Sequence, residues 1–366
     1  MNLDFSEEQK GLKQELARLL RARDTRRGAR EALEGRAAFD APLWRELGQL
    51  GWLSVAIPEA AGGQGLGHEM LCCVAEEIGR SLAAVPFGSS IAVVAEALMC
   101  FGSNAQQQRF LPGLGSGRRI GAFAIAERPG PLREGTIAAT VTGGRLSGRK
   151  IAVTDGMLAD LLLVVALADG VPQFFLVEAH AAGVTREAGT GVDLANAPAS
   201  IHFDNVVAEP LGNAGWAGIR QLLDHSAVLT AFEQVGAADA ALAMATDYAR
   251  ERMAFGRQIG SFQAIKHKLA DVWIANQLAR ANAYYAAWAL QAGSDVLPRA
   301  AASARVSASE AFERAARELI QVHGGIAVTW EHDAHLFYRR AQHLALVFGG
   351  LREWQARLTG LLAAAA

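Results

Sequence analysis

The sequence predicts an α+β protein in which a β-sheet domain lies between two helical domains. Apolar residues recur at helical spacing in the first part of the chain. The period then changes to short runs that are mostly apolar or β-branched, and helical spacing returns in the last part. We therefore expect an N-terminal α-helical domain over residues 1–118, a middle β-sheet domain over 119–212 and a C-terminal α-helical bundle over 213–366.

The first region opens with a helix-start signal. Ser6 followed by Gln9 has the spacing of a capping box, in which each side chain bonds the other residue's backbone N–H. The segments "EEQKGLKQELARLL", "HEMLCCVAEEIGRSL" and "SSIAVVAEALMCFG" space their apolar residues along one helix face. Before the second segment, the Pro and clustered glycines of residues 51–67 predict a loop.

The middle region has the pattern of short strands joined by tight turns. Its apolar or β-branched runs are "RIGAFAIAE", "GTIAATV", "GRLSGRKIAV", "DLLLVVAL" and "PQFFLVE". Gly143-Gly144 and Asp169-Gly170 lie between pairs of these runs, and such dipeptides favour two-residue hairpin turns because they tolerate positive φ. We therefore expect a β domain inserted between helical ones.

From about residue 213 the spacing is again helical. Apolar positions from Val228 to Ala249 alternate intervals of three and four residues, which predicts a helix of more than twenty residues. Consecutive helices of that length are typical of an antiparallel bundle. The pattern breaks at "RERMAFGRQIGSFQAIKHKLAD", residues 250–271, where Phe-Gly and Gly-Ser-Phe-Gln interrupt two otherwise regular helices.

Composition limits the possible functions. The net charge of −2 offers no basic surface for nucleic acid, and 51% hydrophobic residues is ordinary for a globular protein. Cys72, Cys73 and Cys100 have neither metal-site spacing nor a disulfide framework, so we expect no metal site and a reducing compartment. The acidic N-terminus lacks signal-peptide features, and no apolar run approaches the ~18 residues of a membrane span. These features favour a cytoplasmic protein with no membrane partner.

Three stretches of the chain carry a resemblance to one enzyme family. They are "GWLSVAIPEAAGGQGLG" at 51–67, the segment 250–271, and "QVHGGIAVTWEHDAHLFYRRA" at 321–341. With the helical–β–helical order, they resemble the acyl-CoA dehydrogenase family over nearly the whole chain. The resemblance implies that a carboxylate removes the α-proton of an acyl-CoA thioester, that the β-hydrogen leaves as hydride to FAD, and that an electron-transferring flavoprotein receives the electrons.

The resemblance also implies a tetramer in which each FAD lies between two subunits. Six residues are implied to contact the pyrophosphate end of a neighbour's FAD: Arg252, Phe255, Gln263, Gln321, Gly324 and Gly325. A guanidinium suits a pyrophosphate because it makes paired, charge-assisted hydrogen bonds. Taken singly, Arg252 fits a surface ion pair and the glycines fit helix ends, but the two motifs together favour FAD.

The half of the site that grips the isoalloxazine departs from the family pattern. Glu127 and Thr154 are retained as implied flavin-binding residues. Ala126 stands where the family has Thr, and Ala152 stands where it has an aromatic residue packed on the flavin. By resemblance, this chain keeps the half-site that it offers to a neighbour and has eroded its own.

The catalytic base is missing from its usual place. Gly349 falls where many members carry Glu; it has no carboxylate, although its backbone N–H can donate to a thioester oxygen. Some members place the base on the first long helix of the last domain, where this chain has Ser226, and a hydroxyl is a poor base unless another base activates it. Glu233, two helical turns on, is the candidate for a relocated base, and a buried structural acid is the competing interpretation.

Three accounts remain open. In the first, the chain resembles the degenerate subunits of heterotetrameric bacterial steroid or side-chain acyl-CoA dehydrogenases and gives half of a FAD site to a related partner chain. In the second, it is an active homo-oligomeric dehydrogenase with Glu233 as its base. In the third, it is a flavin-free structural subunit. The acyl group is not readable from one sequence.

Overall fold

The computed structural model describes residues 4–364, which form two compact units built from interleaved stretches of chain. The helical unit takes the described residues up to Glu31, then Cys72–Ala84, then those from Ala227 onward. The sheet unit takes Ala32–Leu71 and Val85–Ser226. The domain boundaries expected near residues 118 and 212 stay a prediction, because this division of the chain follows packing rather than sequence order.

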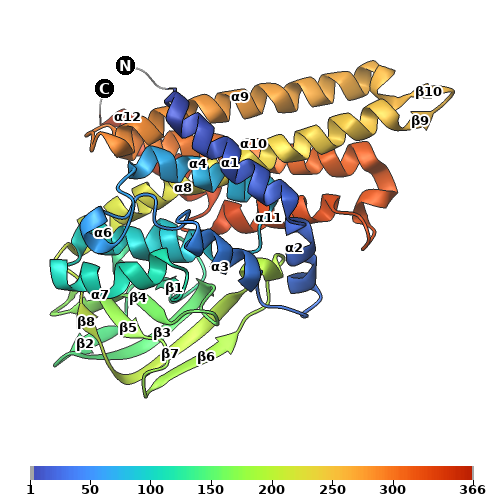
Figure 1. The fold of residues 1–366 in the computed structure, drawn as a ribbon. Coiled ribbons are helices and arrows are strands. Elements are labelled where there is room, and N and C mark those ends of the chain that lie inside the picture. Colours follow the sequence, from blue (N-terminus) through green and yellow to red (C-terminus); the bar gives the residue numbers. More distant parts are fainter. Residues whose placement is uncertain (1–3, 365–366) are drawn as a thin grey trace. The chain divides into compact units, whose positions relative to one another are not determined.

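Helices make up most of the described chain at both ends (Figure 1). Before the sheet they are α1 (Glu7–Ala22), α2 (Thr25–Leu33), α3 (Ala41–Gln49), α4 (Gly67–Ser81), α5 (Phe87–Ser89), α6 (Glu96–Phe101) and α7 (Asn104–Gly115). After the sheet they are α8 (Gly215–Glu251), α9 (Gln263–Gln291), α10 (Leu297–His323), α11 (Ala334–Leu346) and α12 (Leu351–Ala363). The capping box of Ser6 and Gln9 is confirmed at the start of α1.

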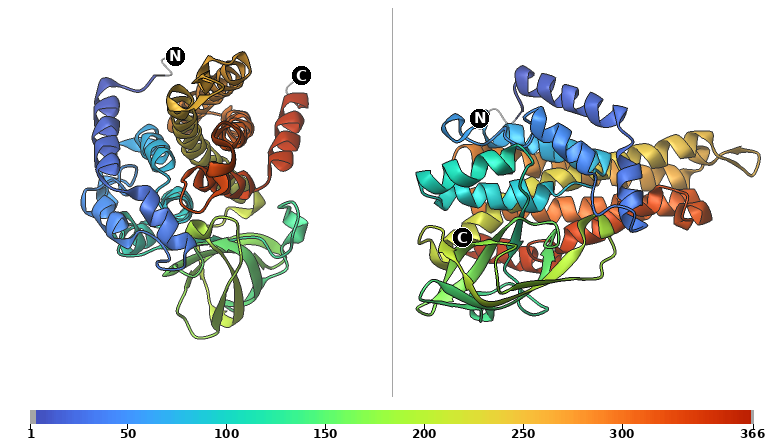
Figure 2. Two further views of the ribbon diagram at one scale, coloured as in Figure 1. Left: turned by 90° about the vertical axis from the view of Figure 1, so that its right-hand side faces the viewer. Right: turned by 60° about the horizontal axis from the view of Figure 1, so that its bottom comes forward.

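The sheet unit contains one mixed sheet, with strand order β6-β7-β3-β2-β4-β5-β8 and β1 paired to β4. Its strands are β1 (Gly121–Ala124), β2 (Thr140–Thr142), β3 (Arg145–Thr154), β4 (Leu161–Ala168), β5 (Val171–Glu178), β6 (Val184–Ala188), β7 (Pro198–Val207) and β8 (Glu209–Pro210). Figure 2 shows this sheet as a curved, open layer. A separate two-stranded ribbon, β9 (Met253–Ala254) and β10 (Arg257–Gln258), belongs to the helical unit.

The predicted fold class is confirmed, and so are both predicted tight turns. β2 and β3 pair antiparallel across Gly143-Gly144, and β4 and β5 pair antiparallel across Asp169-Gly170. All four turn residues have φ between 50° and 80°, as two-residue hairpins need. The run "GTIAATV" was wrong as a continuous strand, because residues Glu134–Thr136 form a 3₁₀ turn and pairing begins only at Thr140.

Apolar strand faces and a short helical segment form the core of the sheet unit. Leu162, Val164, Phe175 and Ile201 are among its buried side chains. The helical residues before α6 lie so close to β1 that a Cβ on Gly121 would meet the side chain of Val94. A glycine is therefore required where this helix crosses the strand.

The helical unit is centred on α10, which packs against α9, α11 and α12. Most of its buried side chains are alanine, so neighbouring helices approach closely. A Cβ on Gly79 of α4 would meet the backbone oxygen of Glu233 on α8, and one on Gly236 of α8 would meet that of Glu76 on α4. Two glycines thus let these helices cross nearly backbone to backbone.

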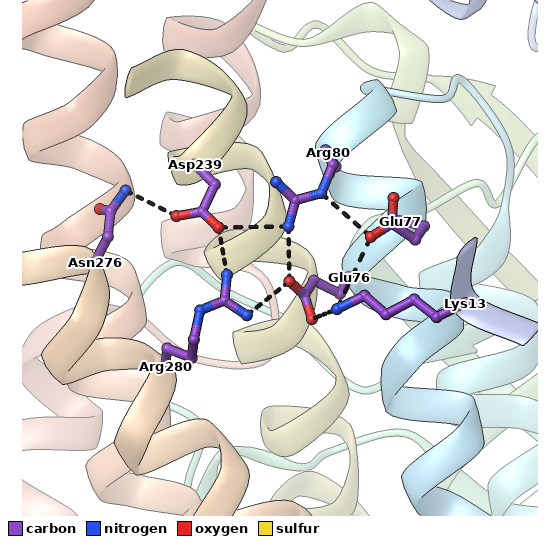
Figure 3. A network of polar contacts seen from close by, with 7 residues as sticks. All are labelled: Lys13, Glu76, Glu77, Arg80, Asp239, Asn276 and Arg280. Carbon is purple, nitrogen blue, oxygen red and sulfur yellow. Dashed lines mark hydrogen bonds and ion pairs between the residues drawn. The ribbon is translucent and has the colours of Figure 1, made fainter. Parts of the chain in front are cut away.

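A charged network joins four helices inside the helical unit (Figure 3). Glu76 on α4 is fully buried and pairs with Lys13 of α1, Arg80 of its own helix and Arg280 of α9. Arg280 and Arg80 also reach Asp239 on α8. Burial alone would raise the pKa of Glu76, but the three cations outweigh it and lower that pKa to about 2.

By length and composition, α8 is the one helix of residues 4–364 that could cross a membrane. The sequence had shown no apolar run of that length, because alanines and scattered polar residues dilute the pattern. In the structure 72% of the apolar window of α8 is buried inside the protein, a burial typical of a core helix.

Candidate functional site

The interruption at residues 250–271 is a hairpin between two long helices. β9 and β10 pair antiparallel with Ala254 opposite Arg257, which leaves Phe255 and Gly256 as a two-residue turn. Phe255 has φ 52° and Gly256 has φ 79°, the conformation of a type I′ turn. Arg252 precedes the ribbon and is exposed. Figure 1 shows the ribbon at the far tip of the α8 and α9 pair.

Phe255 is unusual in both conformation and exposure. An aromatic residue rarely has positive φ, and such strain is most often kept where the side chain has a task. Its side chain is 96% exposed, with one edge-on ring contact to Phe262 at 6.2 Å. The turn therefore presents an aromatic ring to solvent from a fixed backbone.

The N-terminus of α9 lies directly after this ribbon. Gln263 is its first residue and is exposed. The first turn contains no acidic residue, whereas Lys266 and His267 follow and are also exposed. Backbone N–H groups and the partial positive charge of a helix N-terminus favour an anion, and here no local carboxylate opposes one.

The C-terminus of α10 supplies a glycine cradle. Gly324 has φ 67° and ψ −147°, a conformation that is essentially open only to glycine. A Cβ on Gly324 or Gly325 would meet no atom within 4 Å, so the space beside both is open. Gln321, on the last turn of α10, precedes Gly324 by three residues and is exposed.

Two contacts bring these segments to the same end of the helical unit. Tyr248, four residues before Arg252, stacks on His323 with ring centroids 4.1 Å apart. Lys268 near the start of α9 pairs with Glu318 near the end of α10 at 2.8 Å. The segments that carry the six residues predicted to contact a pyrophosphate therefore lie at one end of the helical unit, called the outer end below: Arg252, Phe255, Gln263, Gln321, Gly324 and Gly325.

His323 has a structural environment within the outer end. It is buried, stacks on Tyr248 and hydrogen-bonds through Nδ1 to the carbonyl of Leu319 at 2.9 Å. Burial lowers the pKa of this imidazole. A neutral ring that packs between helices stabilises the cradle and has no partner for proton transfer in these contacts.

The residues between α11 and α12, called the base segment below, are 347–350. Gly349 lies here with φ 110°, a value that L side chains rarely adopt. Its N–H donates to the carbonyl of Leu346 at 3.3 Å, so the donor that the sequence left for a thioester oxygen already has an acceptor. The base segment carries no carboxylate at Gly349. A Glu at this position would have a strained backbone because of the positive φ.

A buried arginine holds the base segment in place. Arg305 on α10 donates to Gln234 at 2.7 Å, to Ser309 at 2.8 Å and to the carbonyls of Val347, at 2.9 Å, and Leu344. Its side chain caps the last carbonyls of α11, as basic residues do at helix C-termini. Burial lowers its pKa to about 10, which leaves the guanidinium charged at neutral pH.

Glu233 is buried on α8 and pairs with another buried arginine. Its Oε1 lies 3.4 Å from Nη1 of Arg340, which also approaches the carbonyl of Ala83. A buried carboxylate paired with a buried guanidinium has the environment of a structural acid. In the sheet unit, Ser226 is buried and donates to the carbonyls of Leu222 and Ala92 at 2.8 and 3.1 Å.

In the sheet unit, Glu127 is engaged by protein groups. Its carboxylate lies 2.6 Å from Nζ of Lys150 and accepts from the backbone N–H groups of Ala138 and Ala139 at 2.8 and 3.0 Å. Lys150 is fully buried, and burial lowers its pKa although Glu127 opposes this. These bonds join the residues after β1 to β3 and to the residues before β2. A flavin would therefore have to share the carboxylate of Glu127 with these protein groups.

Thr154 ends β3, just beyond an irregularity in its pairing with β7. Ala152 lies within this irregularity with φ 52° and is exposed. The strand is thus distorted at the position where an aromatic residue was expected and a methyl group stands.

Sequence reasoning missed two buried groups of polar residues. One is the Arg305 cluster; nothing in its helical surroundings marks it as buried. The other is a set of metal-ligating types in the sheet unit: His68, Glu96, Cys100 and His225. The i,i+4 spacing of Glu96 and Cys100 on one helix was a signal for the second, but its histidines lie far away in sequence.

Two family models and several known proteins match the chain. The acyl-CoA dehydrogenase N-terminal domain model matches residues 6–118, and the acyl-CoA dehydrogenase C-terminal domain model matches residues 213–360. The acyl-CoA dehydrogenase IpdE2 of Mycobacterium tuberculosis is 34% identical over 355 residues, which cover 96% of each protein.

Two solved structures have the same fold as this chain. A chain of the ChsE4–ChsE5 complex from Mycobacterium tuberculosis has a TM-score of 0.91 and 32% identity, with 99% of both chains covered. A variant of the Tcur3481–Tcur3483 steroid ACAD has a TM-score of 0.90 and 33% identity, with 98% of this chain and 99% of that one covered.

Proposed function

Because this chain belongs to the acyl-CoA dehydrogenase family, we propose that it is a subunit of a FAD-dependent enzyme that dehydrogenates an acyl-CoA thioester between its α and β carbons. In this proposal the outer end supplies the pyrophosphate-binding half of a FAD site to a related partner subunit. The partner supplies the isoalloxazine half and the catalytic carboxylate.

One contrast carries the proposal. The outer end keeps an exposed arginine, an exposed aromatic ring and an open glycine cradle. The base segment has Gly349 in place of a carboxylate, and its N–H bonds within the protein. A degenerate subunit is expected to keep the half-site that serves its neighbour and to lack the catalytic carboxylate of its own site.

FAD is the cofactor of the family, and the outer end fits one end of it. When bound, FAD accepts the β-hydrogen of the acyl group as hydride. Arg252 would hold the diphosphate through charge-assisted hydrogen bonds, and the N-terminus of α9 at Gln263 would add partial positive charge. The backbone at Gly324 and Gly325 would admit phosphate oxygens because no side chain stands in the way.

The reaction divides between the two subunits. The α-proton goes to the partner's carboxylate, the β-hydrogen leaves with its electron pair, and a carbon–carbon double bond remains. In this chain Gly349 takes no proton, and Arg305 holds the base segment in its present course. The chain's own contribution is to bind and orient the cofactor rather than to move protons.

The substrate and partners follow by likeness. A large, polycyclic acyl-CoA is proposed, supported by similarity to a structure described as a steroid ACAD. A heterotetramer with a related acyl-CoA dehydrogenase chain is proposed, supported by similarity to the ChsE4–ChsE5 complex. An electron-transferring flavoprotein is proposed as electron acceptor, and the cytoplasm as location.

An active homo-oligomer with Glu233 as its base is the second candidate, since Glu233 is the carboxylate nominated on α8. Its burial against Arg340 weighs against it, because a base must both accept and release a proton at neutral pH. A flavin-free structural subunit has no use for the exposed arginine and the glycine cradle.

The test compares the isolated chain with the assembled one. Alone, the chain is expected to hold little FAD and to show no measurable acyl-CoA dehydrogenation with an artificial electron acceptor. Co-expressed with a partner that retains the base, it should give a yellow complex with fewer flavins than subunits. Loss of a general base costs about 10²–10⁴-fold in rate, so the isolated chain should lie near the detection limit.

Each alternative has its own outcome. Full flavin occupancy and brisk turnover by the isolated chain would refute the partner-subunit proposal. If Glu233→Gln then abolished that turnover while leaving flavin bound, the homo-oligomer with a relocated base would replace it. A complex that is active with a partner but contains no flavin contact from this chain, shown by unchanged flavin content in Arg252→Ala, would favour the structural subunit.

A further inference from the structure

Four side chains of metal-ligating types converge inside the sheet unit, and they share no residue with the outer end or the base segment. His68 comes from the first turn of α4, Glu96 and Cys100 from α6, and His225 from α8. One ligand atom each from His68, Glu96 and His225 lies within 4.8 Å of the others. Three helices thus bring nitrogen, oxygen and sulfur donors to one point.

The donor atoms of His68, Glu96 and His225 lie nearly as close together as metal ligands do, and the sulfur of Cys100 lies near two of them. Glu96 Oε1 lies 2.6 Å from His225 Nδ1, 3.0 Å from His68 Nε2 and 3.3 Å from Cys100 Sγ, and this sulfur lies 3.8 Å from His225 Nδ1. Around zinc, with bonds near 2.0–2.3 Å, ligand atoms lie about 3.3–3.6 Å apart. Shifts of about 1 Å bring the atoms of His68, Glu96 and His225 to that spacing, and Cys100 must in addition turn its sulfur toward His68.

Charge balance favours a cation at this point. Glu96 is fully buried, and a buried carboxylate is costly unless a cation neutralises it. In the described part of the chain its ion-pair partners are His68 and His225, and neither lysine nor arginine pairs with it. Although burial opposes it, Glu96 raises the pKa of His68, so a protonated His68 is one way to neutralise this carboxylate. A divalent ion with one carboxylate, one thiolate and two neutral imidazoles is another, because that set has no net charge.

The donor set indicates which ion. Imidazole, carboxylate and thiolate together suit zinc, which takes four ligands in a closed structural site. The i,i+4 spacing of Glu96 and Cys100 places both on one face of α6, and His68 is about a quarter exposed, which gives the ion a way in. We propose that His68, Glu96, Cys100 and His225 bind one zinc ion that joins α4, α6 and α8.

The first experiment measures metal directly on the wild-type chain. Untagged, full-length protein is purified without chelator, analysed for metals, stripped and titrated with Zn²⁺ or with Co²⁺ as a spectroscopic probe. One metal per chain is expected, with a higher melting temperature on zinc addition and a thiolate-to-cobalt charge-transfer band. No saturable binding of either ion and an unchanged melting temperature would overturn the proposal.

Variants then assign the ligands. His68→Gln keeps a polar side chain at the entrance and should weaken zinc binding at least about 100-fold, the upper end of what loss of an outer partner costs. Cys100→Ser should remove the charge-transfer band while the cobalt remains bound more weakly. His202→Ala is the matched control, because His202 is exposed in the same unit and contacts none of the four.

The test still decides if one of the two variants folds poorly, because the other variant and the wild-type titration give the result. Unchanged zinc affinity in both His68→Gln and Cys100→Ser would show that the metal binds elsewhere and would refute this site. Since all readouts are metal content, spectra and melting temperature, they do not depend on flavin binding or on dehydrogenation.

Discussion

The outer end and the interior of the helical unit use the same helices for opposite purposes. At the outer end, Arg252, Phe255 and Gln263 are exposed, and the glycines face open space. In the interior, Arg305 and Arg340 are buried and their hydrogen bonds end on the protein itself. Polar groups in the first region are exposed and are proposed to bind a ligand, whereas those in the second bond within the fold.

This difference predicts which property of the protein depends on each region. A buried polar network is costly to break, because removing one partner leaves the others unsatisfied in a low-dielectric interior. The base segment is held by such a network although Gly349 has no carboxylate. The exposed residues of the outer end have few partners within the protein, and under the proposed function they contribute to binding instead. Substitutions should accordingly change stability in the interior and ligand affinity at the outer end.

The largest effect is expected for Arg305→Leu. The substitution removes the arginine donor of the buried carbonyls of Leu344 and Val347 and one of the donors to Gln234. The free energy of unfolding, measured by urea titration, should fall by about 3–5 kcal/mol. Arg317→Ala, on an exposed turn of the same helix, should change it by less than about 0.5 kcal/mol. Similar values for the two variants would contradict the distinction.

The next largest loss of stability is expected when the charged network around Glu76 is protonated. Glu76 has a folded pKa of about 2 against an ordinary value of 4.5, so its contribution to stability is present above about pH 4.5 and is lost as the pH falls toward 2. The difference corresponds to about 3 kcal/mol. Urea titrations across this range should show the loss in the wild type and a much flatter profile in Glu76→Gln. Glu15→Gln, exposed on α1, should keep the wild-type profile.

Local features were predictable from the sequence because neighbouring residues determine them. The capping box of Ser6 and the Gly143-Gly144 turn depend on residues a few positions apart, and both are confirmed. The strand Val184–Ala188 was missed because it is largely exposed, so its residues do not alternate between apolar and polar. Its place in the sheet comes from pairing with β7 rather than from a pattern of its own.

The site divides in the same way. The break between two long helices at residues 250–271 was legible, because Phe-Gly and Gly-Ser-Phe-Gln interrupt the helical pattern. The binding roles of Phe255 and Gly324 came from the family resemblance and stay a prediction. The burial of Arg305 was not legible, since its acceptors come from Gln234 and from the end of α11. Long-range partners decide whether a charged residue is buried, and one sequence without a structure does not show them.

At the outer end, Arg252→Ala should weaken FAD binding in the assembled protein about 10–100-fold, the loss expected for a charge-assisted contact. Gln321→Ala removes a neutral contact and should cost less, about 3–10-fold. Flavin content after dilution and dialysis gives both values. Arg250→Ala removes an equally exposed charge two residues away and should leave flavin content unchanged. Unchanged flavin content in Arg252→Ala and Gln321→Ala would mean that both motifs are structural.

The smallest effects are expected at Gly324 and Gly325, where one substitution should change stability and the other flavin affinity. Gly324 has φ 67° and ψ −147°, so Gly324→Ala should lower the free energy of unfolding by about 1–2 kcal/mol through backbone strain alone. Gly325 does not share the positive φ, and a Cβ there meets nothing within 4 Å, so Gly325→Ala should leave stability nearly unchanged.

The same methyl group at Gly325 would nevertheless stand in the open space assigned to the phosphate oxygens. Flavin affinity in the assembled protein should therefore fall in Gly325→Ala although stability does not. Paired urea titration and flavin measurement on the two variants checks this. If Gly325→Ala bound flavin as the wild type does, the cradle would lie elsewhere, and the outer end would be reduced to Arg252, Phe255 and the N-terminus of α9.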